Sequence, residues 1–548
     1  MNLSATDPPP SPTSGWRIAV PAVLLFLLIP IYGISVVNSK IGLNHDAGIY
    51  VATAKSLAEG NGYRIAGYPG GLPQTKYPPL LPLILSAVWR ISPNFPQNEW
   101  LFKLVPVLAL LAWSLACVWF FRTKAKIGLD ASLWILVFTL TNLYCLLTTS
   151  SIMSEALYGV LVIASLAFLA RAGEQPDDWR NVVVAALLAG AAYQTRTAGV
   201  SLVVAGIAAL LIRKRFKHAV LFAAITGVFV VAWMIWQAQP SDASTMTERY
   251  YTAQNYRDLN ALSGVLSADA VVTVGLHNLF FIALSPARTI LQIPASSGYS
   301  LLIALVPSAV FWFLVARGVR RAPPSLWPAA LFASTTMGML VVYAWAPTRF
   351  LLPILPILML YAFLGLPRRP PGLGILCLAA LPMTSAFLFA QNSWTHGVSD
   401  FPAPFGTGGR ANRVESIYWN RVTAVYDWIG SHTPRDAVIL ANYDSTLFLY
   451  TGRMSMRPDA ASWLDLFDST RRALPEKIAE FEALVRKIQP TYLVETGNDD
   501  EVEVDFYRML DSLAASGRLR LVKHIAPRYN IYRITPDGWE PAAPILKE

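Results

Sequence analysis

Five charged residues lie beside apolar segments and have the side chains that a group-transfer reaction needs: Asp46, Lys76, Glu155, Arg196 and Arg349. The Asp46 carboxylate follows a hydrophobic segment and can act as a general base that deprotonates an acceptor hydroxyl or amine. Glu155 begins another apolar segment and adds a second acid. The three cations can bind a phosphate through charge-assisted hydrogen bonds, so the set predicts transfer chemistry at a membrane surface.

Each of these residues also has an ordinary structural explanation. Asp46 can cap a helix or lie in a solvated loop, and Glu155 can stabilise the first turn of a helix through the helix dipole. The two arginines can extend to the membrane interface, and Lys76 can anchor a helix there. Charges within a bilayer are costly, however, so they usually line a cavity, pair with one another or lie at the interface.

Neighbouring side chains extend the candidate site. Tyr50 follows Asp46 at i+4, so the two share a face if this stretch is helical. His45 is a secondary candidate, because residues that are adjacent in a helix do not face each other. Tyr77 lies between Lys76 and a Pro-Pro-Leu sequence that begins an apolar helix, so it belongs to the same group of candidates.

The composition indicates a polytopic membrane protein. Of the 548 residues, 54% are hydrophobic and only 14% are charged. Stretches that are long and apolar enough to cross a hydrocarbon core of about 30 Å occupy most of the chain up to residue 391. The net charge of +10 comes from short basic loops between these stretches. This is the positive-inside pattern of membrane proteins, so nucleic acid is not an expected partner.

Placing the basic loops on the cytoplasmic side predicts about eleven membrane crossings, plus or minus about two. Residues 1–15 are then a disordered cytoplasmic N-terminus, and the loops 38–100 and 239–299 lie outside. The Pro-rich segment 78–91 is too short to cross and predicts a juxtamembrane or re-entrant helix. The apolar run 276–284 fits either an interfacial helix over a lipid-binding cavity or a packing segment. The predicted crossings are 16–37, 101–121, 131–149, 152–170, 181–195, 198–212, 218–238, 300–316, 326–346, 349–366 and 372–391.

Two domains follow from this pattern. Residues 16–391 form the predicted transmembrane domain, and residues 392–548 change to a polar composition that predicts a soluble extracytoplasmic α/β domain. In the latter, apolar runs at 437–440 and 491–494 look like strands, and 475–488 has helical periodicity. The three cysteines of the chain all lie in apolar segments and indicate neither a disulfide framework nor a metal cluster.

Short motifs along the chain resemble the polytopic sugar transferases of the GT-C superfamily, especially the glycosyltransferase 39 group related to protein O-mannosyltransferases and aminoarabinose transferases. The resemblance covers most of the membrane part, and the order and spacing of the motifs are more specific than any one motif. The chain departs from the family where Ala47 replaces a second acid and where Tyr77 separates Lys76 from the prolines. The motifs are Asn44-His45-Asp46-Ala47-Gly48-Ile49-Tyr50, Gly62-Tyr63, Tyr77-Pro78-Pro79-Leu80, Ser154-Glu155-Ala156-Leu157-Tyr158, Arg196-Thr197-Ala198-Gly199 and Arg349-Phe350-Leu351-Leu352-Pro353.

The resemblance implies an inverting glycosyltransferase that moves a sugar from a polyprenyl-phosphate-linked donor to a lipid, glycan or protein acceptor. It implies Asp46 as the catalytic base, Glu155 as a second acidic site residue, and Lys76, Arg196 and Arg349 as ligands of the donor phosphate. Together with the topology, it implies a multi-pass protein of the plasma (inner) membrane that acts at its outer face. No cofactor is required, and no metal is expected, although Asp46 and Glu155 could share a divalent ion.

Two other functions stay open at this point. A secondary transporter or lipid flippase would also have many helices and intramembrane charges, but transporters usually show repeat symmetry and polar sites near the midplane. In this chain the charges gather at one predicted face, and no two halves correspond. A non-catalytic scaffold that presents the C-terminal domain would need no acid in the first external loop.

Overall fold

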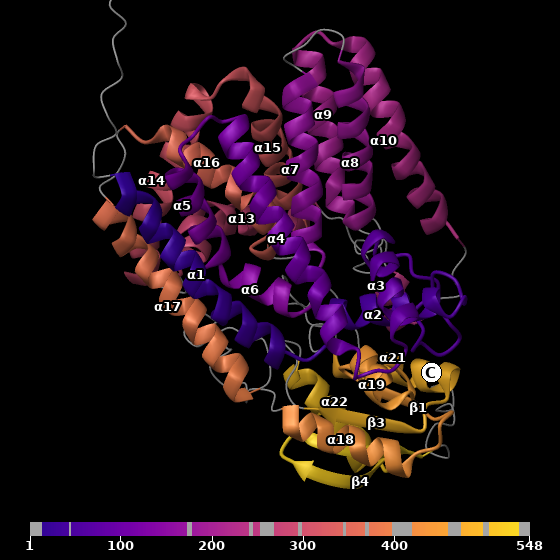
Figure 1. The fold of residues 1–548 in the computed structure, drawn as a ribbon. Helices are drawn as coiled ribbons and strands as arrows, with labels where there is room; N and C mark the ends of the chain where they lie inside the picture. Colours follow the sequence, from indigo (N-terminus) through magenta and orange to yellow (C-terminus); the bar gives the residue numbers. More distant parts are fainter. Residues whose placement is uncertain are drawn as a thin grey trace, which may run out of the picture.

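The computed structural model describes residues 14–42, 45–172, 178–239, 245–252, 268–293, 299–343, 347–367, 372–396, 419–458, 473–496 and 503–535. Long helices run side by side through most of the molecule, and a small mixed sheet with its own helices lies at one end of them (Figure 1). Two basic turns lie at the opposite end of the bundle. They are residues 124–128 and residues 213–215.

Each of the eleven predicted crossings coincides with a helix, or with a pair of short helices. Their bounds are α1 (Ser14–Asn38), α4 (Glu99–Thr123), α5 (Leu129–Leu140) with α6 (Leu143–Ser150), α7 (Glu155–Ala172), α8 (Trp179–Thr195), α9 (Val200–Ile212), α10 (Phe216–Gln237), α14 (Tyr299–Arg321), α15 (Trp327–Val341), α16 (Leu355–Gly365) and α17 (Gly372–His396). The fold is therefore the predicted polytopic helical one, with a C-terminal α/β region.

Among the described residues, six helices are long and apolar enough to cross a membrane by themselves: α1, α4, α7, α10, α14 and α17. The pair α5 and α6, bent by 67°, makes a seventh if it counts as one broken span. Asn142 explains the bend, because its side chain accepts a hydrogen bond from the N–H of Tyr144 and caps α6. Shorter helices such as α16, buried along almost its whole length, complete the bundle interior.

Close packing inside the bundle depends on small residues. Gly318 of α14 and Gly365 of α16 face each other, and a Cβ atom on Gly318 would lie 1.8 Å from the Tyr361 carbonyl oxygen. Helices in membranes gain stability from such close backbone approach, since apolar side chains have no solvent to avoid there. The outer face of α10, in contrast, exposes Val220, Val228, Val231, Met234 and Ile235, as expected for a surface in contact with lipid.

The first predicted external loop contains two helices, α2 (His45–Ala58) and α3 (Leu80–Ile91). α3 has only 12 residues and starts directly after Pro79, so its length agrees with a helix that does not cross the membrane. α2 begins at His45, which places Asp46 in its first turn and Tyr50 one turn later. Asn44, in the same motif, lies outside the described residues.

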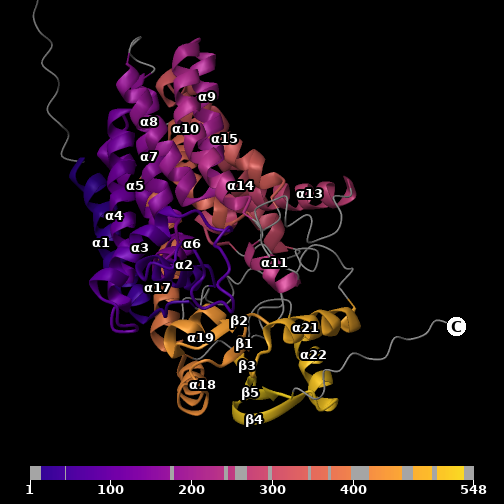
Figure 2. The ribbon, with the colours of Figure 1, turned by 90° about the vertical axis from the view of Figure 1, so that its right-hand side faces the viewer.

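The second predicted external loop is more helical than its sequence indicated. It contains α11 (Met246–Thr252), α13 (Ala268–Ser285) and the π-helical turn η2 (Pro286–Ile290). In Figure 2, α13 lies crosswise to the long helices of the bundle. The polar pair His277-Asn278 interrupts the apolar pattern of α13, but Asn278 is buried and donates to carbonyl oxygens at the end of α15, 2.6 Å from that of Tyr343.

The C-terminal region forms a five-stranded sheet with the order β2-β1-β3-β5-β4. β1 runs parallel to β2 and β3, whereas β5 runs antiparallel to β3 and β4. Ile439 and Leu440 of β1 point to opposite faces, and helices cover both, so the strand is apolar throughout. The bounds are β1 (Val438–Ala441), β2 (Met454–Met456), β3 (Tyr492–Thr496), β4 (Leu519–Ala526), β5 (Tyr529–Ile534), α18 (Trp419–His432), α19 (Asp444–Thr451), α21 (Leu474–Ile488) and α22 (Glu503–Ala515).

Candidate active site

Asp46 lies at the centre of a cluster of charged and aromatic side chains. The Tyr77 hydroxyl donates a hydrogen bond to Asp46 Oδ1 at 2.5 Å, and Arg349 Nη2 lies 3.0 Å from Asp46 Oδ2. The Asp46 side chain is 20% exposed, so part of the carboxylate stays accessible. The two aligned donors fix its direction, and a carboxylate held in this way can accept a proton from a nucleophile placed beside it.

Glu155 is fully buried at the start of α7 and is joined to two guanidinium groups. Arg196 Nη1 lies 2.8 Å from Glu155 Oε1, and Arg349 Nε lies 3.4 Å from the same oxygen. Arg349 therefore contacts the carboxylates of both Asp46 and Glu155. A buried carboxylate needs this compensation, because an uncompensated charge would cost several kcal/mol of desolvation.

The charge of Asp46 is set by opposing effects on its pKa. Burial raises the pKa of Asp46, but the positive charges of Arg349 and Lys76 and the Tyr77 hydrogen bond together lower it below its usual range. The group is therefore ionised at neutral pH. Its charge is balanced within the cluster, and it is in the form that a general base requires.

The chain positions these groups at the ends of helices, where the backbone is irregular. Arg196 has an extended conformation between α8 and the 3₁₀ turn η1 (Thr197–Gly199), and its Nη1 also donates to Ser154 Oγ at 2.9 Å. Arg349 begins the 3₁₀ segment η4 (Arg349–Ile354). Ile152 adopts a left-handed φ of +57°, which is costly for a β-branched residue and turns the chain sharply between α6 and Glu155.

The loop that carries Lys76 and Tyr77 is held mainly through its backbone. Gln74 Oε1 accepts hydrogen bonds from the N–H groups of Lys76 and Tyr77, and the Tyr63 hydroxyl donates to the Tyr77 carbonyl at 2.7 Å. The end of α10 adds a further anchor, since Trp236 Nε1 donates to the Gln74 carbonyl at 2.9 Å. Lys76 Nζ lies 5.4 Å from the centre of the Tyr77 ring, and its charge acts on Asp46.

The structure thus brings seven of the eight candidate residues to one place, and His45 points elsewhere. The Tyr50 ring contacts that of Tyr77 edge to face at 4.9 Å, and its hydroxyl lies 3.5 Å from Ser154 Oγ. His45 Nε2 instead lies 3.1 Å from Asp444 Oδ1 in the C-terminal region. Adjacent positions of α2 therefore face different parts of the molecule.

One further cation near the site was not among the residues singled out from the sequence. Arg288 lies in η2, half-buried, with its guanidinium 4.4 Å from the centre of the Phe281 ring. Tyr144 is within electrostatic reach of both Arg288 and Arg349, and its hydroxyl lies 2.9 Å from Thr348 Oγ1. Within the described residues, no carboxylate lies at ion-pair distance from Arg288. A lone arginine directly after an apolar run was the available sequence signal.

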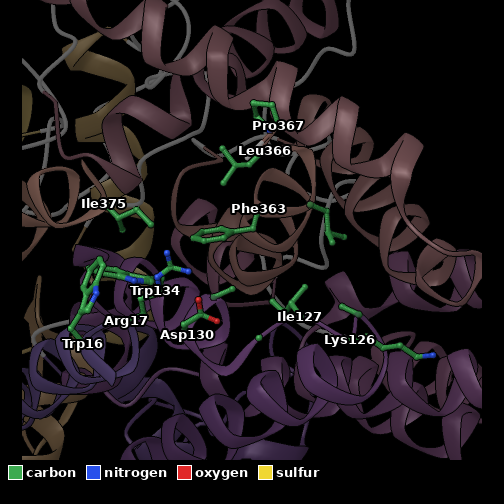
Figure 3. Close-up of a pocket in the computed structure, with 14 residues that line it drawn as sticks. Trp16, Arg17, Lys126, Ile127, Asp130, Trp134, Phe363, Leu366, Pro367 and Ile375 are labelled. Carbon is green, nitrogen blue, oxygen red and sulfur yellow. The ribbon is translucent and has the colours of Figure 1, made fainter. Parts of the chain in front are cut away.

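Two cavities described in the structure lie away from this cluster. One, of about 430 Å³, lies between the starts of α1 and α5 and the end of α16, near the basic turns, with Trp16, Arg17, Asp130 and Trp134 in its wall (Figure 3). The other, of about 600 Å³, lies between the end of α3 and α19. Neither is lined by Asp46 or Glu155.

The sequence left open a divalent ion shared by Asp46 and Glu155, but the structure has a guanidinium group at that position. The Arg349 side chain lies between the carboxylates of Asp46 and Glu155, where such an ion would need to lie. Among the described residues, no group of three or more His, Cys, Asp or Glu side chains could hold a metal. The polar groups around Asp46 thus suit an anion more than a cation.

Comparison with known proteins gives a fold. No family model and no curated protein matches the chain. Among solved structures, ArnT from Cupriavidus metallidurans bound to undecaprenyl phosphate is similar, with a TM-score of 0.56 and 16% identity, covering 96% of this chain and 100% of that one. The archaeal oligosaccharyltransferase AglB from Archaeoglobus fulgidus, in complex with an inhibitory peptide and a dolichol-phosphate, has a TM-score of 0.53 and 13% identity, covering 96% of this chain and 75% of that one. The chain therefore has an ArnT-like fold, which it also shares, at low sequence identity, with the archaeal AglB structure.

Proposed function

We propose that the protein is an inverting glycosyltransferase that transfers a sugar from a polyprenyl-phosphate-linked donor to an acceptor at the outer face of the plasma membrane. The observation that carries this proposal is an ionised, partly exposed Asp46 held between Arg349 and Tyr77, with Lys76 acting on the same carboxylate. The similar ArnT structure holds undecaprenyl phosphate, and the similar AglB structure holds a dolichol-phosphate.

In the proposed reaction, Asp46 accepts the proton of the acceptor hydroxyl or amine as its oxygen or nitrogen bonds to the anomeric carbon of the sugar. The bond between that carbon and the phosphate oxygen breaks on the opposite face, so the configuration inverts. The phosphate leaves with its negative charge and needs cations more than an acid. Lys76 provides one such cation, and Arg288, which lies within electrostatic reach of Tyr144, provides a second.

Arg196 and Arg349 have two roles in this proposal. Both contact carboxylates, which fixes their planes, and a guanidinium has five N–H donors, so each retains donors for a phosphate oxygen. Glu155 touches no solvent and orients the two guanidinium groups. Orientation of this kind lowers the barrier because the charged groups need not reorganise as the leaving group separates.

The test is sugar transfer by purified protein from a panel of polyprenyl-phosphate donors carrying radiolabelled sugars, with membrane lipids, glycans and peptides as acceptors. The Asp46→Asn variant should lose at least about 100-fold in rate, the usual contribution of a general base. Glu59→Gln, which removes an exposed carboxylate from the other end of the same segment, is the matched control and should keep the wild-type rate. Equal transfer by wild type and Asp46→Asn would contradict the role of Asp46. Donor-independent lipid movement without transfer would favour a flippase.

A further inference from the structure

The C-terminal region packs directly on the helix that carries Asp46. Helix α19 lies against α2, as Figure 1 shows, and the contact is too close for larger side chains. A Cβ atom on Gly48 of α2 would lie 2.7 Å from Ser445 Oγ, and one on Gly42, just before α2, would lie 2.3 Å from Thr446 Oγ1. The backbone of the first turn of α2 therefore packs directly against α19.

A buried polar network joins the same two helices. Asp444, the first residue of α19, is 3% exposed, and its Oδ1 lies 3.1 Å from His45 Nε2. The Tyr251 hydroxyl of α11 donates to Asp444 Oδ2, and it accepts a hydrogen bond from the N–H of Arg457 at 3.1 Å. Burial raises the pKa of Asp444, but His45 and Tyr251 together lower it below its usual value, so the carboxylate is ionised.

We propose that Asp444 is a positioning residue for the reaction: through His45, it holds the first turn of α2 so that Asp46 keeps its place beside Arg349. This inference rests on the proposed function. His45 and Asp46 are successive residues about 100° apart around α2. The C-terminal region thus holds this turn through His45, while the membrane helices hold it through Asp46. No contact between Asp444 and the substrates is needed.

The physical reason is the sensitivity of a transfer reaction to the placement of its base. A displacement of about 1 Å at the reacting groups can cost about 100-fold in rate. Loss of the Asp444 carboxylate would remove a buried polar contact of His45, so the C-terminal region would hold the first turn of α2 less firmly. The rate of the chemical step should fall, while the binding of the lipid donor should not change.

The experiment compares Asp444→Ala with Glu495→Ala in the full-length protein. Glu495 is the matched control, because it is a 1% exposed carboxylate in β3 of the same sheet, bound to Asn530 at 2.6 Å and away from α2. We expect kcat of Asp444→Ala to fall about 10-fold or more with KM for the donor within about twofold of wild type, and kcat of Glu495→Ala to stay near wild type. Asp444→Asn, which keeps an acceptor oxygen toward Tyr251, should recover part of the loss.

Wild-type kcat in Asp444→Ala, a change in KM alone, or an equal loss in Glu495→Ala would overturn the inference. Hydrogen exchange gives a readout that does not depend on activity: amides 47–58 should exchange faster in Asp444→Ala than in wild type or Glu495→Ala. Unchanged exchange in this segment would likewise overturn it. If the wild type transfers no sugar from any donor, the proposed function fails, and the exchange result still decides whether Asp444 holds α2.

Discussion

Arg349 determines the geometry of the candidate site, because one guanidinium contacts both Asp46 and Glu155. The sequence allowed these residues to be assigned to one membrane face from the positions of basic loops and apolar segments. It could not predict which charges would pair, since Glu155 and Arg349 are almost two hundred positions apart and their approach depends on the packing of α7 against η4. The helix-dipole explanation of Glu155 considers only its own helix and omits both arginines.

Asp444 shows a second limit at this scale. Asp444 lies in a C-terminal segment without a recognisable motif, and its partner His45 was a secondary candidate because it adjoins Asp46. The side chains of His45 and Asp46 do face different parts of the molecule, as expected for adjacent residues of a helix. A residue that acts by holding another has no sequence signal of its own, because its partner is brought near only by the fold.

The lowered pKa of Asp46 predicts the pH dependence of the reaction. The lowered pKa also affects folding stability. The ionised Asp46 carboxylate stabilises the folded protein at pH values above its pKa in the unfolded chain, about 3.9, and this stabilisation is lost as the pH falls through the pKa of the folded protein. Asp46 should therefore stay ionised from about pH 5 to about pH 8, and kcat/KM should show no acidic limb from this residue. The pH–rate profile of purified protein measures this. A fall in kcat/KM near pH 6 whose midpoint shifts in Asp46→Glu would contradict the prediction.

At the level of elements, hydropathy predicted the long helices well, because a segment surrounded by lipid must satisfy its own backbone hydrogen bonds. The bend between α5 and α6 was not predicted, since it depends on Asn142, which caps α6 and also donates to the Thr289 carbonyl in η2. α13 was not predicted as a full helix for a related reason. Its polar residue Asn278 is accommodated only because the carbonyl oxygens at the end of α15 accept its hydrogen bonds.

The contact between α14 and α16 gives a prediction about stability. Gly318→Ala should destabilise the protein by about 1–3 kcal/mol, because the added methyl group would overlap the Tyr361 carbonyl oxygen and push the two helices apart. Gly338→Ala in the neighbouring α15 is the control, since a Cβ atom there meets nothing within 4 Å. Thermal unfolding in detergent measures both. Equal midpoints for the two variants would show that the close approach is not required.

For the molecule as a whole, the basic turns and the C-terminal sheet lie at opposite ends of the bundle (Figure 1). The sequence had predicted this from loop charge and from the change in composition near residue 392. The sequence could not predict that the C-terminal region packs directly against α2 through α19. That contact depends on glycines at 42 and 48, whose role becomes visible only with α19 in place.

The orientation of the chain in the membrane can be measured with single cysteines. In a variant with its three cysteines replaced by serine, Asn61→Cys and Arg520→Cys should react with a membrane-impermeant maleimide in intact cells, because both positions are exposed at the end predicted to be external. Lys217→Cys, exposed near the start of α10, should react only after the membrane is opened. The reverse pattern would contradict a cytoplasmic N-terminus.

Helix α10 has a lipid-exposed face and also contacts the loop that carries Lys76. Its 22 residues span about 33 Å, close to the thickness of a hydrocarbon core, and its apolar outer face is exposed. At its end, Trp236 and Gln237 donate to the carbonyl oxygens of Gln74 and Thr75, next to Lys76. A helix adjusts its tilt when hydrophobic length and membrane thickness do not match. We therefore expect acyl-chain length to shift the loop that presents Lys76, so that membrane thickness becomes a mechanical control on the reaction.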